Sequence, residues 1–262
     1  MSVYSLQLKP TFLAEANKKI EVLATCPLGE FPQLELCKAR FLPRWHLRLV
    51  YAGWGFDSLP RLFNLKLQTM QRQILANFDN EGIIVYQAFN PSIAEEAVRL
   101  GSFGKGFNLD RMTWIKPSFG WMLYRSDYAT KHNQERILKI KLSHEGFQTI
   151  LSQGIHTSFE PDLFNSDLDW QLALRRSEVR YQWDPDRDLQ LRRLERRALQ
   201  VGIQGSVVRN YVNQWIVEIE DVTELAHAIK KAVESQQKQL PLVPEEGIYE
   251  VSLQIQKTLH IG

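Results

Sequence analysis

Between Ile83 and Ser235 the chain alternates short apolar runs with segments that carry helix caps, yet the two kinds of segment do not follow a strand–helix–strand rhythm. A regular rhythm of that kind is typical of a parallel sheet covered by helices. Its absence favours the α+β class over a doubly wound sheet. We therefore predict an α+β fold with a single mixed-sheet domain and flanking helices.

The 262 residues, of which 44% are hydrophobic, are enough for one large domain with short additions. We assign 1–57 to an N-terminal extension, 58–235 to the core domain, and 236–262 to a linker and a C-terminal strand. Ser58 marks the start of the core because it can cap the first long amphipathic helix of this region. The C-terminal strand is predicted because apolar residues alternate between 249 and 255.

Cap residues give the clearest local signals inside the core. Asn90 followed by Pro91 opens a helix that Gly101 closes, directly after a strand predicted for Ile83–Ala88. Ser143 can cap a second helix. The remaining predicted elements are strands at Ile137–Leu142, Val179–Trp183, Ala198–Ile203 and Trp215–Ile219, helices from Ser206 and Thr223, and a turn at Asp184–Asp186.

Composition excludes several classes of function. The 32 basic and 30 acidic residues nearly cancel, so any electrostatic recognition must come from local clusters. Apolar runs stay below the roughly 18 residues of a membrane-spanning helix, and the first ten residues lack a signal-peptide pattern. We therefore expect a cytoplasmic protein without a membrane partner. Cys26 and Cys37 are expected to be free thiols, and no histidine stands in a zinc-ligand pattern, so no metal is predicted.

The segment from Arg111 to Arg136 concentrates cations, hydroxyls and tryptophans. Its apolar runs at Met112–Ile115 and Phe119–Tyr124 predict a hairpin with a Lys-Pro-Ser turn. Arg111 and Arg125 then face each other across the turn that carries Lys116. Arginine and lysine are the side chains that bind phosphate, so we expect these three cations to converge on one anion-binding pocket.

The tryptophans of this segment allow two interpretations. A tryptophan face can stack on a base or a nicotinamide, which makes Trp121 a candidate ligand contact. Alternatively, Trp114, Trp121 and Met122 fill the core of the hairpin while the cations extend into water.

Several strings of this sequence resemble the DUF4291 family, whose function is unknown. The similarity covers about residues 68–231 and is most specific in RMTWIKPSF. It implies that the motif residues act together, but it implies no reaction. The strings are VYQAFNPSIAEEAVRLGSF (Val85–Phe103), RMTWIKPSFGWMLYRS (Arg111–Ser126), QERIL (Gln134–Leu138), VRYQWDPDRDL (Val179–Leu189), RALQVGI (Arg197–Ile203) and WIVEIEDVT (Trp215–Thr223).

The order of these elements is also similar to that of ADP-ribosyltransferases. That resemblance implies NAD as cofactor, held by Tyr86 on the first strand and oriented by the hydroxyl of Ser118 or Ser126. Glu135 would stabilise the cationic ribose. The sequence departs from the family pattern because Gln134 and Glu135 are adjacent and no Ser-Thr-Ser occurs.

The sequence supports one function hypothesis and one alternative. The first is a nucleotide-phosphate-binding protein, which the second resemblance narrows to an NAD-dependent ADP-ribosyltransferase-like enzyme acting on nucleic acid or protein. Its predicted catalytic residues are Glu135, Tyr86 and Ser118, and Glu218 is the alternative to Glu135 as the acid. The alternative is a non-catalytic nucleic-acid or nucleotide-binding module that binds phosphates through the segment Arg111–Arg125 and the arginine cluster of 175–197. If this cluster does not bind phosphates, it is a solvated, salt-bridged surface. The predicted cofactor-binding residues are Arg111, Lys116, Trp121, Arg125, Ser126 and Gln87.

Overall fold

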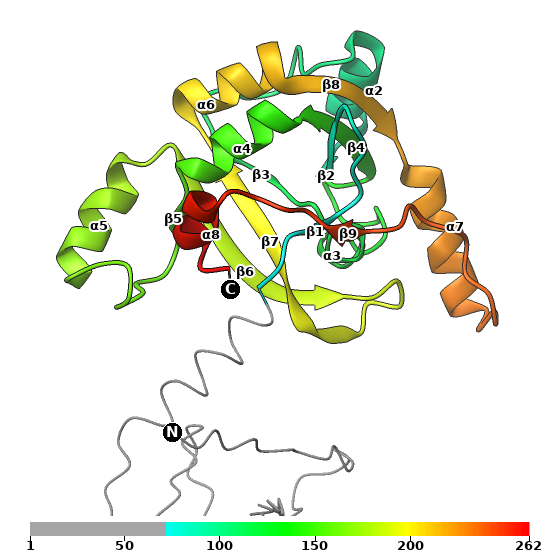
Figure 1. Cartoon of the computed structure of the whole chain (residues 1–262). Helices are drawn as coiled ribbons and strands as arrows, with labels where there is room; N and C mark the ends of the chain where they lie inside the picture. Colours follow the sequence, from blue (N-terminus) through cyan, green and yellow to red (C-terminus); the bar gives the residue numbers. More distant parts are fainter. Residues whose placement is uncertain (1–71, 262) are drawn as a thin grey trace, which may run out of the picture. The chain divides into compact units, whose positions relative to one another are not determined.

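The computed structural model describes residues 72–261, which all belong to one compact unit (Figure 1). The predicted extension, 1–57, lies outside the described residues, as does the start of the predicted core. The described part combines mixed sheets with helices, so the α+β class is confirmed. No helix in the described part is long and apolar enough to cross a membrane.

A three-stranded antiparallel sheet has the order β2 (Gly82–Phe89), β4 (Arg136–Ser143) and β8 (Ile216–Asp221). Alternation along β2 sends its side chains into two different apolar cores. Ile83 packs in the larger core and its neighbour Ile84 in the smaller one. The sheet is therefore covered on both faces, which explains why β2 reads as a continuous apolar run.

A four-stranded sheet has the order β3 (Thr113–Ile115), β7 (Arg193–Ile203), β6 (Val179–Arg187) and β5 (Ile155–His156). Strands β3, β7 and β6 are antiparallel, and β5 runs parallel to β6. The turn predicted at Asp184–Asp186 is wrong, because these residues continue β6 through a register shift against β7.

The two faces of this larger sheet differ in chemistry. On β6, Val179 and Tyr181 are buried in the larger core, while Gln182 between Tyr181 and Trp183 faces the other way. Gln182 is paired in register with Gln200 of β7, so the two amides lie on the same polar face. This polar face forms the floor of the site described below.

Helices cover the three-stranded sheet on both sides. Helices α3 and α7 pack in the smaller core, and α4 contributes to the larger core. The caps predicted at Asn90, Gly101 and Ser143 are confirmed, whereas Thr223 caps nothing and instead accepts a hydrogen bond from the Ile137 amide. The helical elements are α2 (Pro91–Leu100), α3 (Phe119–Ser126), α4 (His144–Ser152), α5 (Asp167–Arg176), α6 (Gly205–Asn210), the π-helical turn η1 (Tyr211–Trp215), α7 (Thr223–Glu234) and α8 (Leu253–Leu259).

Two predicted strands are wrong. The second half of the expected hairpin is helix α3, because the Ser118 side chain accepts the Trp121 amide and caps it. At the C-terminus, a short strand β9 (Gly247–Ile248) pairs with β1 (Leu75–Ala76). The chain then enters α8, capped by Ser252, so the alternation between 249 and 255 does not continue as a strand.

Candidate functional site

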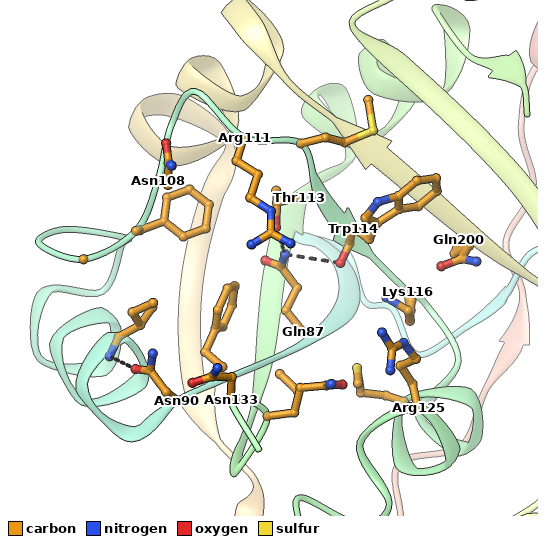
Figure 2. A pocket seen from close by; sticks show the side chains of 18 of the residues that line it. Gln87, Asn90, Asn108, Arg111, Thr113, Trp114, Lys116, Arg125, Asn133 and Gln200 are labelled. Atoms are coloured by element: carbon orange, nitrogen blue, oxygen red, sulfur yellow. Dashed lines mark hydrogen bonds between the residues drawn. The ribbon is translucent and has the colours of Figure 1, made fainter. Parts of the chain in front are cut away.

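Within residues 72–261, the two larger sheets are joined by a backbone bridge between Tyr86 of β2 and Lys116, which follows β3. The Tyr86 amide donates to the Lys116 carbonyl at 2.7 Å, and the Lys116 amide donates back at 3.2 Å. Beside this bridge lies a cavity of about 790 Å³. Its walls come from the end of β2, the start of α2, the loop before β3, one side of α3 and the polar face of β6 and β7 (Figure 2).

Arg111, Lys116 and Arg125 all line this cavity (Figure 2). Arg111 precedes β3, and Lys116 and Arg125 lie at opposite ends of the segment that contains α3. The ion pairs of the described residues involve other cations, so none of these three is neutralised by a carboxylate in this part of the chain. The residues that line the cavity in 72–261 also include no aspartate or glutamate. The site is therefore electropositive.

Lys116 is the most deeply placed of the three cations, with 6% of the residue exposed. Burial, together with the nearby charge of Arg125, lowers the pKa of the Lys116 ammonium from 10.5 to about 8. The charge of Asp184 opposes this shift only in part. An anion in the cavity would supply the missing counter-charge.

Helix α3 is held in place at its N-terminus by two carboxylates. The Ser118 hydroxyl donates to Asp186 at 2.7 Å, and Glu246 accepts the Phe119 amide at 2.8 Å. Burial raises the pKa of Glu246 to about 7. Gly120 lets the helix approach the sheet, because a Cβ there would come within 2.1 Å of the Arg187 carbonyl oxygen. These contacts fix the helix that carries Arg125.

Gln87 joins the walls of the cavity through a buried network. Its side-chain nitrogen donates to the Thr113 hydroxyl at 2.6 Å and to the Trp114 carbonyl at 3.2 Å, and its oxygen accepts from the Tyr211 hydroxyl at 2.7 Å. Gln87 therefore lines the cavity, but its side-chain amide forms its hydrogen bonds with other residues of the protein. It positions β3 beside β2.

Trp114 presents an indole to the cavity from β3, where it lies across Gly202 of β7. A Cβ at Gly202 would come within 2.9 Å of the Trp114 ring and 2.8 Å of the Met112 sulfur. Any larger residue would displace one of them. The opposite wall contains Phe107, which stacks on Phe103 with ring centroids 4.2 Å apart. The cavity thus combines aromatic surface with cationic groups.

Amide side chains complete the lining. Gln200 donates to Asp184, a carboxyl whose pKa is raised by burial, and its oxygen remains available to the cavity. Gln182 lies beside it. The sequence-based prediction of the site missed Gln182 and Gln200, although their alternation with apolar neighbours indicates a shared face. The remaining lining amides are Asn90, Asn108, Asn133 and Gln134.

The three predicted catalytic residues do not meet at this cavity. Tyr86 is buried in the smaller core, where it packs against Phe119, and burial raises the pKa of its hydroxyl. It faces away from the cavity because it neighbours Gln87 on the same strand. Ser118 is occupied as a helix cap.

Glu135 follows two cavity residues but does not itself line the cavity. Its Oε1 accepts the Asn133 amide at 2.9 Å, and hydrogen bonds from its own amide and that of Asn133 hold its pKa below the ordinary value. Of the other candidates, Glu218 is exposed on β8. Trp121 and Ser126 both lie in α3 and are buried, and the Ser126 hydroxyl donates to the Met122 carbonyl. The tryptophan at the cavity is therefore Trp114.

The predicted arginine cluster of 175–197 is partly neutralised. Arg196 pairs with Asp186 at 2.7 Å and Arg192 with Asp188 at 2.7 Å. Arg187 lies 4.0 Å above the Tyr124 ring. No three His, Cys, Asp or Glu side chains within 72–261 come together as a metal-binding group.

The fold and site together define an α+β domain built around a cationic, amide-lined cavity. A family profile described as a domain of unknown function (DUF4291) matches residues 73–249, which is more than half of the chain, so this protein belongs to that family. The match includes every residue that lines the cavity in the described part. A search of curated proteins finds no match.

Proposed function

We propose that this protein binds a nucleotide through its phosphate groups in the cavity beside β3. The observation that supports this most is the convergence of Arg111, Lys116 and Arg125 on a cavity without an acidic lining residue in 72–261. Cations in such a site bind anions strongly, because no carboxylate among the lining residues of 72–261 competes for them. A location in the cytoplasm, as expected from the sequence, is part of the same proposal.

The other lining groups favour a nucleotide over a simple anion. The indole of Trp114 offers a stacking face, and Gln182, Gln200 and Asn133 offer amides that can pair with the edge of a base. The volume of about 790 Å³ falls in the range of small-molecule sites.

Calorimetry on the full chain with ADP and with pyrophosphate tests the proposal. Arg111→Gln and Arg125→Gln should each weaken both ligands by about 10- to 100-fold, since a hydrogen bond to a charged group contributes about 1.5–3 kcal/mol. Arg192→Gln is the matched control, because it removes the same charge from a residue that does not line the cavity. Binding that is absent in the wild type, or equally reduced by all three changes, would refute the proposal.

The narrower hypothesis, NAD-dependent ADP-ribosyl transfer, adds the requirement of a carboxylate near the ribose. Glu135 is the candidate because it directly follows the cavity residues Asn133 and Gln134. Released nicotinamide, measured with wild type and Glu135→Gln, tests this step. The non-catalytic alternative predicts binding of nucleotide or single-stranded oligonucleotide with no release of nicotinamide from either protein.

A further inference from the structure

Lys116 has surroundings that differ from those of the paired lysines in the described part. Lys139 and Lys141 each form an ion pair at 2.8 Å, with Glu220 and Asp79 respectively. Lys116 has no such partner among the described residues, is buried, and ends at a cavity large enough for a ligand. Its amine is therefore accessible to a bound molecule but shielded from bulk water.

Burial and a neighbouring cation are the two conditions that convert a lysine into a nucleophile. Both apply here, since Lys116 is desolvated and Arg125 lies close enough to oppose its charge. With a pKa of about 8, a useful fraction of this amine is uncharged near neutral pH. An ordinary surface lysine is almost entirely protonated there.

We propose that Lys116 is a nucleophile that forms an imine with a phosphorylated aldehyde or ketone bound in this cavity. The inference rests on the proposed function, because Arg111 and Arg125 supply the site for the phosphate.

The reaction balances without an oxidant or a reductant. The lone pair of the uncharged Lys116 Nζ attacks the carbonyl carbon and forms the C–N bond. The nitrogen then loses protons while the carbonyl oxygen gains them and leaves as water. The Asp184 carboxylate, whose charge acts on Lys116, is the group that can accept a proton from the nitrogen and pass it to the departing oxygen, and Gln200 holds it by a hydrogen bond.

Reductive trapping tests this proposal on the full-length wild-type protein. Pyridoxal 5′-phosphate is added, the imine is reduced with borohydride, and the labelled lysine is found by peptide mass spectrometry. At pH 7 Lys116 should be labelled about tenfold or more faster than other lysines, because a pKa of about 8 against 10.5 gives it a roughly 300-fold larger uncharged fraction. Pyridoxal without phosphate should label it more slowly, and pyrophosphate should protect it.

Two variants strengthen the test. Lys116→Arg keeps a cation but removes the nucleophilic amine, so the fast label should disappear. Lys139→Arg, the matched control, should leave it unchanged. The pH profile of labelling at Lys116 should level off above about pH 8, as its pKa requires.

The outcomes separate this proposal from the proposed function. Pyrophosphate binding in calorimetry with no fast label at Lys116 would overturn the imine and leave the phosphate site intact. Equal labelling of Lys116 and surface lysines would also overturn it. Fast labelling by pyridoxal and pyridoxal 5′-phosphate alike, without pyrophosphate binding, would refute the phosphate site and with it the phosphorylated substrate class.

Discussion

The Tyr211 hydroxyl donates a 2.7 Å hydrogen bond to the side-chain oxygen of Gln87, and both side chains are buried. The two residues are 124 positions apart, so this contact connects η1 with the strand that ends at the cavity. Because Gln87 also holds Thr113, one hydroxyl helps to set the distance between β2 and β3.

Replacing Tyr211 with phenylalanine should destabilise the protein without changing its shape. The Gln87 oxygen would lose its buried donor, which costs about 1–3 kcal/mol. Unfolding in urea measures the loss. Tyr124→Phe is the control, because Tyr124 is 38% exposed and should change the free energy of unfolding by less than about 0.5 kcal/mol. Equal losses in the two variants would show that the Gln87 contact contributes nothing.

Ser118→Ala separates a structural role from a catalytic one. The change removes the cap of α3 and the hydrogen bond to Asp186, so we expect a loss of about 1–2 kcal/mol in the free energy of unfolding. Ser92→Ala, at an exposed position in α2, should have little effect. The opposite result would be a Ser118→Ala protein that is as stable as the wild type but releases no nicotinamide, although the wild type does. That result would support a catalytic role for Ser118.

Lys116→Met should stabilise the protein while weakening anion binding. The pKa of Lys116 is lowered from 10.5 in the unfolded chain to about 8 in the folded one, so the unfolded chain holds more protons between these values. Wild-type stability should therefore rise with pH from about 8 to about 10.5, and the penalty is complete below pH 8. The variant should lack this rise and gain on the order of 3 kcal/mol at pH 7. Thermal unfolding across the pH range measures both effects, and a variant with the wild-type profile would contradict them.

Gly202→Ala should weaken the contacts of a bound nucleotide's base more than the contacts of its phosphates. An added methyl displaces the Trp114 indole or the Met112 sulfur, so ADP should bind about tenfold more weakly while pyrophosphate is unchanged. Gly247→Ala is the control, because its Cβ meets nothing closer than 3.6 Å. If ADP and pyrophosphate weaken together, Trp114 does not contact the base.

Local chemistry explains which parts of this fold could be predicted. Asn90, Gly101 and Ser143 act within a few residues of themselves, so their caps are visible in the sequence. Residues 119–123 are buried all round, which erases the periodicity that separates a helix from a strand. The predicted hairpin failed for that reason.

The residues of the site also differ in whether they could be predicted from the sequence. Arg111, Lys116 and Arg125 are close in sequence, and they share the cavity although a helix replaces the predicted strand. The partners on β6 and β7 come from 57 or more positions further along the chain (Arg125 to Gln182), and only the register of the strands places Gln182 beside Gln200. Trp121, which was predicted on a strand of the hairpin, lies buried in α3, and Trp114 lines the cavity instead.

The bridge between Tyr86 and Lys116 has a thermodynamic consequence for any ligand. Both backbone groups of Lys116 are fixed by hydrogen bonds to a strand of the other sheet, so the main chain that carries its side chain is placed when the chain folds. Binding then requires little further loss of backbone entropy at this residue. A cation on a main chain that is fixed in advance favours selective binding of a ligand of matching shape over adaptation to many ligands.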